Sequence, residues 1–363
     1  MKSISNVIGN ILISLIILHI INVKCFSQSK SEKIDSLMKE YYKKDLFNGS
    51  ILVTEHREII YNKSFGYSNI KTKEELSDSS IFNLASLAKQ FTATAIMILY
   101  ERNELSYKDK LVKYIPELKP IANGITIRHL LNHTSGLPEY LEENICYPEI
   151  TNQAVIDFVK HSEKLVFEPG EQYSYCNTGY VMLATIIERI SKQTYHQFLE
   201  ENIFKPLLMK NTFVYEINKR GTKNVVNGYK EDKNIDKYET FTFGDGNIYS
   251  TLQDMFKWEQ SLYTEKLVKA ATLDEAFKKS KLSNGDEVNY GYGWNISESN
   301  KVIYHRGGWA GANTSITRYT HNQNAIIILS NFTPTNNNNM FIIESAIEDI
   351  LANKPISSPQ FGR

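Results

Sequence analysis

The sequence predicts an α+β protein: an antiparallel sheet flanked by N- and C-terminal helices, with an inserted mostly helical lobe. Three observations support this fold class. Strand-like segments with turn residues between them occur early, near residues 49–69, and again late, after residue 285. A long block of helical patterns separates the two groups, and one amphipathic helix lies outside each of them.

The first elements follow directly from the spacing of apolar residues. Residues 31–45 carry Ile34, Leu37, Met38 and Tyr41 on one helical face, so an amphipathic helix is expected there. Two strands should follow around the polar turn 54–57. A buried helix is then expected from Ser86 to Tyr100, because its apolar residues recur with helical period.

The remaining elements complete the order helix, strands, helices, strands, helix. The patterns predict helices within 125–138, 152–162, 178–204 and 250–262, strands at 290–296, 301–309, 313–319 and 324–331, and a closing helix at 340–352. We therefore expect one domain over 28–363, with an α/β lobe from about 30–85 and 285–355 and a helical lobe from about 86–284. A cleft between lobes is a favoured place for a binding site.

Composition excludes several classes of protein. With 363 residues, 42% hydrophobic and 23% charged, the chain is typical of a globular protein with a sizeable core. Acidic and basic residues balance at 41 each, so no overall field favours nucleic acid as a partner. The sequence contains no phosphate-binding Gly-rich lysine loop and no dinucleotide fingerprint, and no cofactor is expected.

The N-terminus predicts export from the cytoplasm. A basic start, a long apolar stretch and the small-x-small site Cys25–Ser27 are typical of a signal peptide over 1–27. The alternatives are an uncleaved anchor helix and, less favoured, a lipid anchor on Cys25, because the small residues expected before a lipidated cysteine are missing. All three place the protein in the periplasm or outside the cell, with membrane contact only if this segment is retained.

The first candidate for chemistry is the pair Ser86 and Lys89. A serine followed three residues later by a lysine occurs four times in the chain, so the pattern alone decides nothing. Only this pair begins a buried helix directly after a strand-rich segment, with both side chains on one helical face. A desolvated lysine can take the hydroxyl proton of a serine, and the helix N-terminus favours a developing oxyanion. The alternative is a helix cap with a solvated lysine.

Two further segments contain polar residues that could converge on one site. Tyr175 and Asn177 precede a helix; a tyrosine can carry protons and an asparagine can hold a lysine and a substrate carbonyl. His305–Gly308 ends a β segment, where glycines permit a substrate to approach a strand backbone. Taken singly, a helix cap and a glycine-rich hairpin explain these segments equally well.

A metal site is not favoured. His129 and His133 are spaced as neighbours on a predicted helix, but the segment lacks the glutamate of a zinc protease. No metal ligands are therefore assigned.

Taken together, the three segments resemble a known family. Ser86–Lys89, Tyr175–Asn177 and His305–Gly307 are similar, in order, to the three motifs of the penicillin-recognising serine enzymes, over roughly residues 35–350. The His-x-Gly form resembles the branch of class C β-lactamase-like proteins, D-alanyl-D-alanine carboxypeptidases and related esterases. The resemblance implies the β-lactamase and peptidase fold.

The resemblance also implies a role for each matching residue. Ser86 would attack a carbonyl and become acylated, while Lys89 and Tyr175 would exchange its proton and pass one to the leaving group. Asn177 would orient Lys89 and the substrate amide, and His305 would set the electrostatics of the far wall. The backbone N–H groups of Ser86 and Gly308 would form the oxyanion hole.

One position departs from the family pattern. The family usually has a small hydroxyl or amide residue between the His and the Gly, whereas this chain has Arg306, beside Gly307. Arginine could bind a substrate carboxylate in a bidentate way, or its bulk could reshape the pocket. Cys176 lies inside the second motif, so we favour free thiols over a bridge to Cys146, although the pairing stays open.

The resulting hypothesis is a secreted or periplasmic serine hydrolase that forms an acyl-enzyme on Ser86. Its substrates would be β-lactams or D-alanyl peptide amides. The alternatives are a carboxylesterase that acts on small acyl esters and a non-catalytic cell-wall-binding protein. The sequence leaves open how fast the acyl-enzyme is hydrolysed and which oligomer forms.

Overall fold

The computed structural model describes residues 28–142, 150–216, 221–236, 241–333 and 339–356. The expected signal peptide and Cys146 lie outside the described residues. Of the helices within these ranges, none combines the length and the apolar character needed to cross a bilayer.

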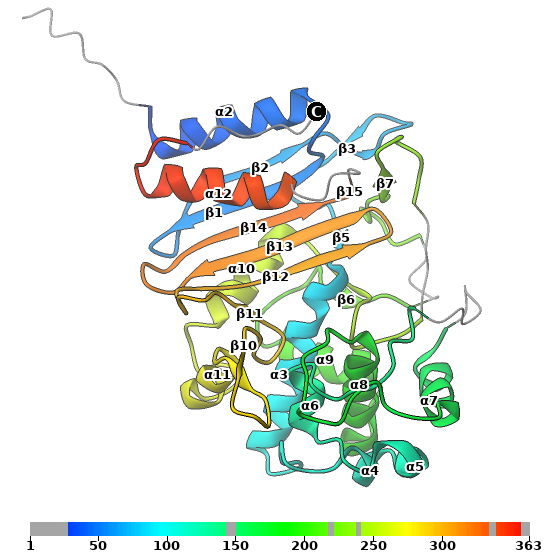
Figure 1. The fold of residues 1–363 in the computed structure, drawn as a ribbon. Helices are drawn as coiled ribbons and strands as arrows, with labels where there is room; N and C mark the ends of the chain where they lie inside the picture. The colour runs from blue at the N-terminus through cyan, green and yellow to red at the C-terminus, as the bar shows by residue number, and fades with distance from the viewer. Residues whose placement is uncertain (1–27, 143–149, 217–220, 237–240, 334–338, 357–363) are drawn as a thin grey trace, which may run out of the picture.

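The centre of the fold is a six-stranded antiparallel sheet (Figure 1). Its order is β11 (Asn295–Ile296), β12 (Val302–Trp309), β13 (Ala312–Tyr319), β14 (Asn324–Ser330), β1 (Gly49–Glu55) and β2 (Glu58–Phe65). The early and late strands meet where β1 pairs with β14, with Ile51 opposite Ile328. Segments more than 250 residues apart therefore share one sheet, and the predicted α+β fold class is confirmed.

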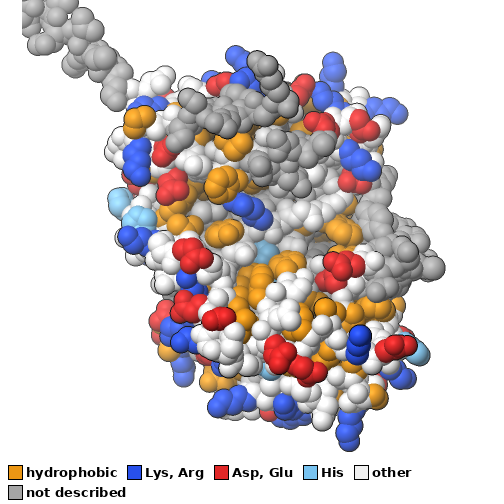
Figure 2. Space-filling model, in the orientation of Figure 1, with side chains coloured by type: hydrophobic (Ala, Val, Ile, Leu, Met, Phe, Trp, Pro, Cys, Tyr) orange, Lys and Arg blue, Asp and Glu red, His pale blue; other side chains and the backbone are white. Residues whose placement is uncertain are grey.

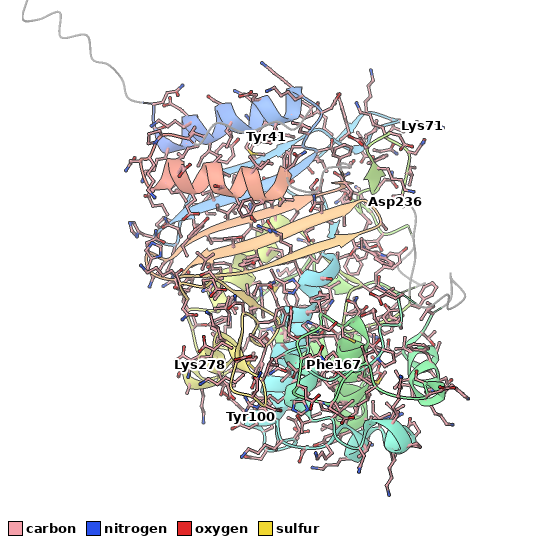
Figure 3. The ribbon with its side chains drawn as sticks, in the orientation of Figure 1. Tyr41, Lys71, Tyr100, Phe167, Asp236 and Lys278 are labelled. Carbon is pink, nitrogen blue, oxygen red and sulfur yellow. The ribbon has the colours of Figure 1, made fainter. Side chains whose placement is uncertain are left out.

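Two terminal helices cover one face of this sheet. They are α2 (Lys30–Lys43) and α12 (Asn339–Leu351), which lie side by side at the top of Figure 1. The apolar face expected for the first helix is buried against the sheet, and Tyr41 lies in this layer (Figure 3). The helix starts at Ser29, whose hydroxyl accepts from the N–H of Glu32 in a capping box.

The opposite face of the sheet is packed against helices of the middle block. Helix α3 (Ala88–Glu101) runs away from the sheet, and α10 (Leu252–Ser261) packs against β14 and β1. Sheet residues Leu52, Ile327 and Leu329 belong to the same hydrophobic cluster as α3 and α8 (Asn177–Ser191). One continuous core therefore joins the inner face of the sheet to the helical lobe.

Shorter elements complete the structure. The helices are η1 (Ala85–Leu87), α4 (Leu111–Tyr114), η2 (Pro116–Leu118), α5 (Lys119–Ala122), α6 (Ile127–Leu131), α7 (Asn152–His161), α9 (Tyr195–Leu199), η3 (Glu200–Phe204) and α11 (Ala270–Ala276). The strands are β3 (Tyr67–Asn69), β4 (Glu74–Glu75), β5 (Phe82–Asn83), β6 (Phe213–Val214), β7 (Tyr229–Lys230), β8 (Ile248–Ser250), β9 (Ser280–Lys281), β10 (Glu287–Val288) and β15 (Phe332–Thr333).

Turns fix where strands end in two segments for which the sequence made a prediction. The hairpin at 54–57 forms as expected, with its turn residues His56 and Arg57 at φ 49° and 72°. The strand expected over 290–296 is wrong for most of its length, since only Asn295–Ile296 forms β11. Gly293 has φ +77°, and a Cβ there would lie 2.8 Å from the carbonyl oxygen of Lys89, so this segment turns against α3.

Candidate active site

Ser86 lies in η1, the short turn between β5 and α3. The turn is held by the side chain of Asn83, whose Oδ1 accepts from the N–H of Ala85 at 2.8 Å. Ala85 has φ 48°, a left-handed conformation that is costly for a residue with a Cβ. The strained turn brings the serine to the wall of a pocket, one helical turn before Lys89.

Lys89 is fully buried and contacts Ser86 directly. Its Nζ lies 3.1 Å from Ser86 Oγ and donates to Asn177 Oδ1 and to the backbone oxygen of Asp245, each at 2.8 Å. Three oxygen acceptors match the three hydrogens of an ammonium. Among the described residues, no carboxylate lies within ion-pair distance of this nitrogen. The cation is therefore solvated by neutral groups.

Tyr175 contacts the lysine through the face of its ring. Lys89 Nζ lies 4.9 Å from the centroid of the Tyr175 ring, and Tyr175 is 37% exposed. The ring also packs 4.3 Å from the imidazole of His133. The phenol thus stands between the lysine and solvent, and its role in proton transfer stays a prediction.

Strand β12 forms the wall opposite the nucleophile. A Cβ on Gly307 would lie 2.4 Å from the oxygen of Leu84 and 3.0 Å from the nitrogen of Ser86. Only glycine therefore allows the strand to approach the turn that carries the serine. Ser86 and Gly308 line the same pocket, as an oxyanion hole made from their N–H groups requires.

His305 lies on the site face of β12 and is neutral. Its Nδ1 lies 2.8 Å from the carbonyl oxygen of Arg306, which can only accept, so Nδ1 carries the hydrogen. Its Nε2 then accepts from the hydroxyl of Tyr290 at 2.9 Å. Burial and the charge of Lys89 lower the pKa of His305 to about 3. The imidazole therefore supplies no positive charge to the far wall.

Arg306 does not face the pocket, which corrects the expectation that it binds or reshapes the substrate site. Its Nη2 lies 2.7 Å from Glu344 Oε2 of α12, and its guanidinium lies over the rings of Tyr304 and Phe341. Side chains alternate between the two faces of a strand. Since His305 points toward the site, Arg306 must point toward the terminal helices.

The residues around Ser86 line a pocket of about 430 Å³. Figure 2, in the orientation of Figure 1, shows hydrophobic side chains gathered at mid-height of the molecule, where the sheet meets the helical lobe. The described lining includes Asn83, Ser86, Tyr140, Asn177, Asp245, Asn247, Gly308 and Trp309. None of the described lining residues is a Lys, Arg or His. The positive charge nearest to Ser86 is therefore that of Lys89, behind the wall of the pocket.

Sequence reasoning missed two carboxyls next to this pocket, the buried Asp245 and the half-buried Glu139. Asp245 accepts from the hydroxyl of Tyr140 at 2.7 Å, and Glu139 accepts from the N–H groups of Asn177 and Leu141. Burial raises the pKa of both groups. The signal available in the sequence was an aspartate between two glycines, Gly244 and Gly246.

The histidine pair at 129 and 133 does not share a helix. Helix α6 ends at Leu131, and His133 adopts φ 58°. His133 Nδ1 accepts from the N–H of Cys176 at 3.0 Å, and burial keeps its pKa well below the usual range. Within the described ranges, no three His, Cys, Asp or Glu side chains are grouped as a metal site. Cys176 is a buried free thiol.

Comparison with known proteins identifies the family. The family model named beta-lactamase matches residues 33–345. The chain belongs to the beta-lactamase family. This membership makes it a serine hydrolase related to the penicillin-binding proteins.

The relatives span several named proteins of this family. Penicillin-binding protein 4* of Bacillus subtilis is 34% identical, covering 92% of this chain and 78% of the relative. Putative penicillin-binding protein PbpX of the same species is 29% identical, with 74% and 66% covered. The octameric penicillin-binding protein homologue from Pyrococcus abyssi aligns with a TM-score of 0.77 at 25% identity, over 90% of this chain and 78% of that one.

A further solved structure supports the fold alone. The D-amino acid amidase from Ochrobactrum anthropi has a TM-score of 0.75 at 23% identity, with 89% of this chain and 97% of that one covered. In the structure of this chain, Ser86, Lys89 and Asn177 form one hydrogen-bonded group. Gly307 packs against the backbone of Ser86, and the ring of His305 lies 6.2 Å from the ring of Tyr175. Arg306 is the predicted site residue that the structure places elsewhere.

Proposed function

We propose that this protein hydrolyses amides through an acyl-enzyme on Ser86 and that its substrates are D-alanyl peptides or β-lactams. The observation that carries the proposal is the 3.1 Å contact between Lys89 Nζ and Ser86 Oγ, with Lys89 held by Asn177 and the backbone of Asp245. A weak serine nucleophile needs such a neighbour to remove its proton. The name penicillin-binding protein 4*, carried by one relative, supports penicillin as a first acylating probe.

The chemistry follows from the arrangement of these groups. Once the Lys89 and Tyr175 pair has lost one proton, Ser86 Oγ attacks the carbonyl carbon and passes its own proton to that pair. The N–H groups of Ser86 and Gly308 hold the resulting oxyanion. When the C–N bond breaks, the pair returns the proton to the leaving nitrogen. Water then attacks the ester on Ser86, restoring the hydroxyl and releasing the acid.

Labelling by a fluorescent penicillin tests this proposal. We expect covalent labelling of the purified mature chain and its complete loss in Ser86→Ala. A chromogenic cephalosporin and a D-Ala-D-Ala peptide then rank the substrates. Retention of cell-wall material without turnover of any substrate would instead favour the non-catalytic binding protein.

A second candidate function is hydrolysis of small acyl esters, and the charges of the site favour it. Substrates such as β-lactams and C-terminal D-alanyl peptides carry a carboxylate, for which a site normally supplies cations or several donors. Here His305 is neutral and Arg306 faces α12. A neutral ester has no carboxylate to bind. Faster acylation by a p-nitrophenyl ester than by either carboxylate-bearing substrate would support this candidate.

The size of the cleft supports an extended substrate for either reaction. A second cavity of about 1640 Å³ adjoins the pocket, and both share Asn83 as a lining residue. It is lined by aromatic, aliphatic and uncharged polar side chains together with Asp236, which is labelled in Figure 3. Room of this kind suits a chain longer than a dipeptide. Longer acyl donors should therefore have a lower KM.

We also propose that the enzyme works outside the cytoplasm. The support is the composition of residues 1–27, with its basic start and apolar stretch. Cell fractionation with an antibody against the mature chain tests this. A protein found only in the cytosol would contradict the proposal.

A further inference from the structure

The carboxyl of Asp245 is buried next to the nucleophile and only half satisfied. Its Oδ2 accepts from the hydroxyl of Tyr140 at 2.7 Å, and the residue is 7% exposed. Its Oδ1 is fully buried and has no hydrogen-bond partner among the described residues. An unsatisfied buried oxygen is costly unless a nearby charge compensates it.

Lys89 is the nearby opposite charge. The same residue that supplies this carboxyl also gives its backbone oxygen to Lys89 Nζ, at 2.8 Å. Burial raises the pKa of Asp245, and the charge of Lys89 is the largest influence that opposes this rise. The lysine in turn has only neutral oxygens in direct contact.

Glu139, the second and only half-buried carboxyl, is stabilised differently. It accepts from the backbone N–H groups of Leu141 and Asn177, which satisfy both of its oxygens. Burial raises the pKa of Glu139, and these two hydrogen bonds oppose the rise more than Lys89 does. The charge of Glu139 is therefore balanced mainly by backbone dipoles.

The other titratable groups around Lys89 are two imidazoles and two phenols, and none of them is a carboxyl. They are His133, Tyr175, Tyr180 and His305. Burial lowers the pKa of both imidazoles and raises the pKa of Tyr180 well above its ordinary value. Tyr175 is the partly exposed member of this set.

We propose that Asp245 is a positioning residue that acts through Lys89: its carboxylate is the counter-charge that sets the proton affinity of the Lys89 and Tyr175 pair. The inference rests on the proposed function of Ser86. Because the carboxylate is not in contact with Nζ, it stabilises the ammonium without fixing the proton there permanently, as a direct ion pair would. The hydroxyl of Tyr140 keeps the carboxylate in place.

This role predicts a shift with a definite sign. Removal of a negative charge near the pair makes loss of a proton easier, whichever of the two groups gives it up. The midpoint of the pH profile for acylation should therefore move to lower pH in Asp245→Asn. The expected shift is about one pH unit or more.

The experiment measures labelling of Ser86 by a neutral, serine-directed fluorophosphonate between pH 5.5 and 9.5. The expected result is a wild-type midpoint that falls in Asp245→Asn and falls less in Glu139→Gln. It should also fall less in Tyr140→Phe, which removes the hydrogen bond to the Asp245 carboxylate but keeps both carboxyls. Asp245→Glu, which keeps the charge, should retain the wild-type midpoint even if its rate is lower. If Asp245→Asn does not fold, Asp245→Ser removes the same charge and should give the same shift.

The outcomes separate this inference from the function on which it rests. A wild-type chain that the probe does not label, or labels equally in Ser86→Ala, overturns the proposed function. A labelled wild type whose midpoint is unchanged in Asp245→Asn overturns only the role of Asp245. An equal shift in Tyr140→Phe also overturns it, because the hydrogen bond rather than the charge would then be responsible.

Discussion

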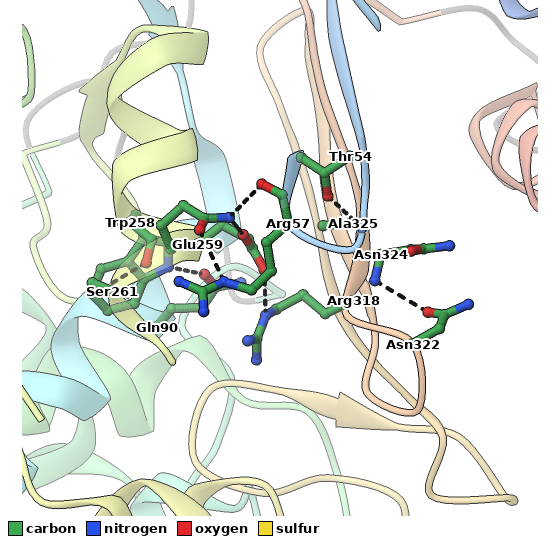
Figure 4. Close-up of polar contacts among 11 residues, drawn as sticks. Thr54, Arg57, Gln90, Trp258, Glu259, Ser261, Arg318, Asn322, Asn324 and Ala325 are labelled. Carbon is green, nitrogen blue, oxygen red and sulfur yellow. Dashed lines mark hydrogen bonds and ion pairs between the residues drawn. The ribbon is translucent and has the colours of Figure 1, made fainter. Parts of the chain in front are cut away.

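Two buried cations in this protein are stabilised in opposite ways. Lys89 is 0% exposed and donates only to neutral oxygens. Arg318 on β13 is 3% exposed and donates to the carboxylate of Glu259 on α10 at 3.0 Å. Gln260 donates to the other oxygen of that carboxylate at 2.8 Å. Figure 4 shows this second group, which joins the sheet to the helical lobe.

The difference matches the role proposed for each cation. A guanidinium does not lose its proton in proteins, so a direct carboxylate contact only strengthens a structural joint. The Arg318 guanidinium also lies 4.5 Å from the ring of Tyr263, which shields it further. A lysine that must exchange a proton cannot be held in this way. The charge of such a lysine has to be balanced by a carboxylate that does not contact its nitrogen directly.

Substitution of Lys89 should produce the largest effect on activity. Lys89→Met should lower the rate of acylation by about 10³-fold, because the serine loses its proton acceptor. Its free energy of unfolding should change less than in variants of the other cation. Burst kinetics with a p-nitrophenyl ester and urea unfolding measure the two effects. Near-normal acylation would mean that Lys89 is not part of the chemistry.

Substitution of Arg318 should have the opposite profile. Arg318→Met should lower the free energy of unfolding by about 3–5 kcal/mol, because it leaves the carboxylate of Glu259 buried and unpaired. Combining it with Glu259→Leu should recover most of the loss. Acylation per folded molecule should stay at the wild-type level in both. If Arg318→Met were as stable as the wild type, the ion pair with Glu259 would not stabilise the contact between the sheet and the helical lobe.

The free energy of unfolding should depend on pH through His305, which lies near Lys89. His305 is neutral in the folded state because burial lowers its pKa to about 3, whereas an unfolded histidine titrates near 6.5. The unfolded chain therefore binds more protons below pH 6.5, and stability falls from there toward pH 3. The slope for this one group is about 1.4 kcal/mol per pH unit. Urea unfolding at several pH values should give a shallower slope for His305→Gln.

Arg306 should show the smallest effect. Its ion pair joins a side chain that is 40% exposed to the Glu344 carboxylate, which is 6% exposed and also accepts from Thr317, so Arg306→Thr should cost about 1–2 kcal/mol. Because the side chain points toward α12, the ratio of acylation rates for a cephalosporin and a p-nitrophenyl ester should not change. A changed ratio would place Arg306 back in the substrate site.

The comparison also shows which parts of the site could be predicted from the sequence. Ser86 and Lys89 were identifiable because, of the four pairs with this spacing, only theirs begins a buried helix directly after a strand-rich segment, with both side chains on one helical face. Asp245 was not, because its importance comes from burial beside a lysine 156 positions away in the chain. Glu139 was missed for the same reason. The direction of Arg306 was also undetermined, since alternation fixes only that neighbours on a strand point to opposite faces.

The amino-acid sequence by itself determined the order of elements, the hairpin at 54–57 and the three segments that carry the site, because apolar periodicity and turn chemistry are local properties. The tertiary structure decided which face of β12 meets the pocket, which histidines are buried and neutral, and which carboxyl lies beside the lysine. These features depend on burial and on distances between remote segments. Proton affinity in particular follows from the surroundings that packing creates around a group.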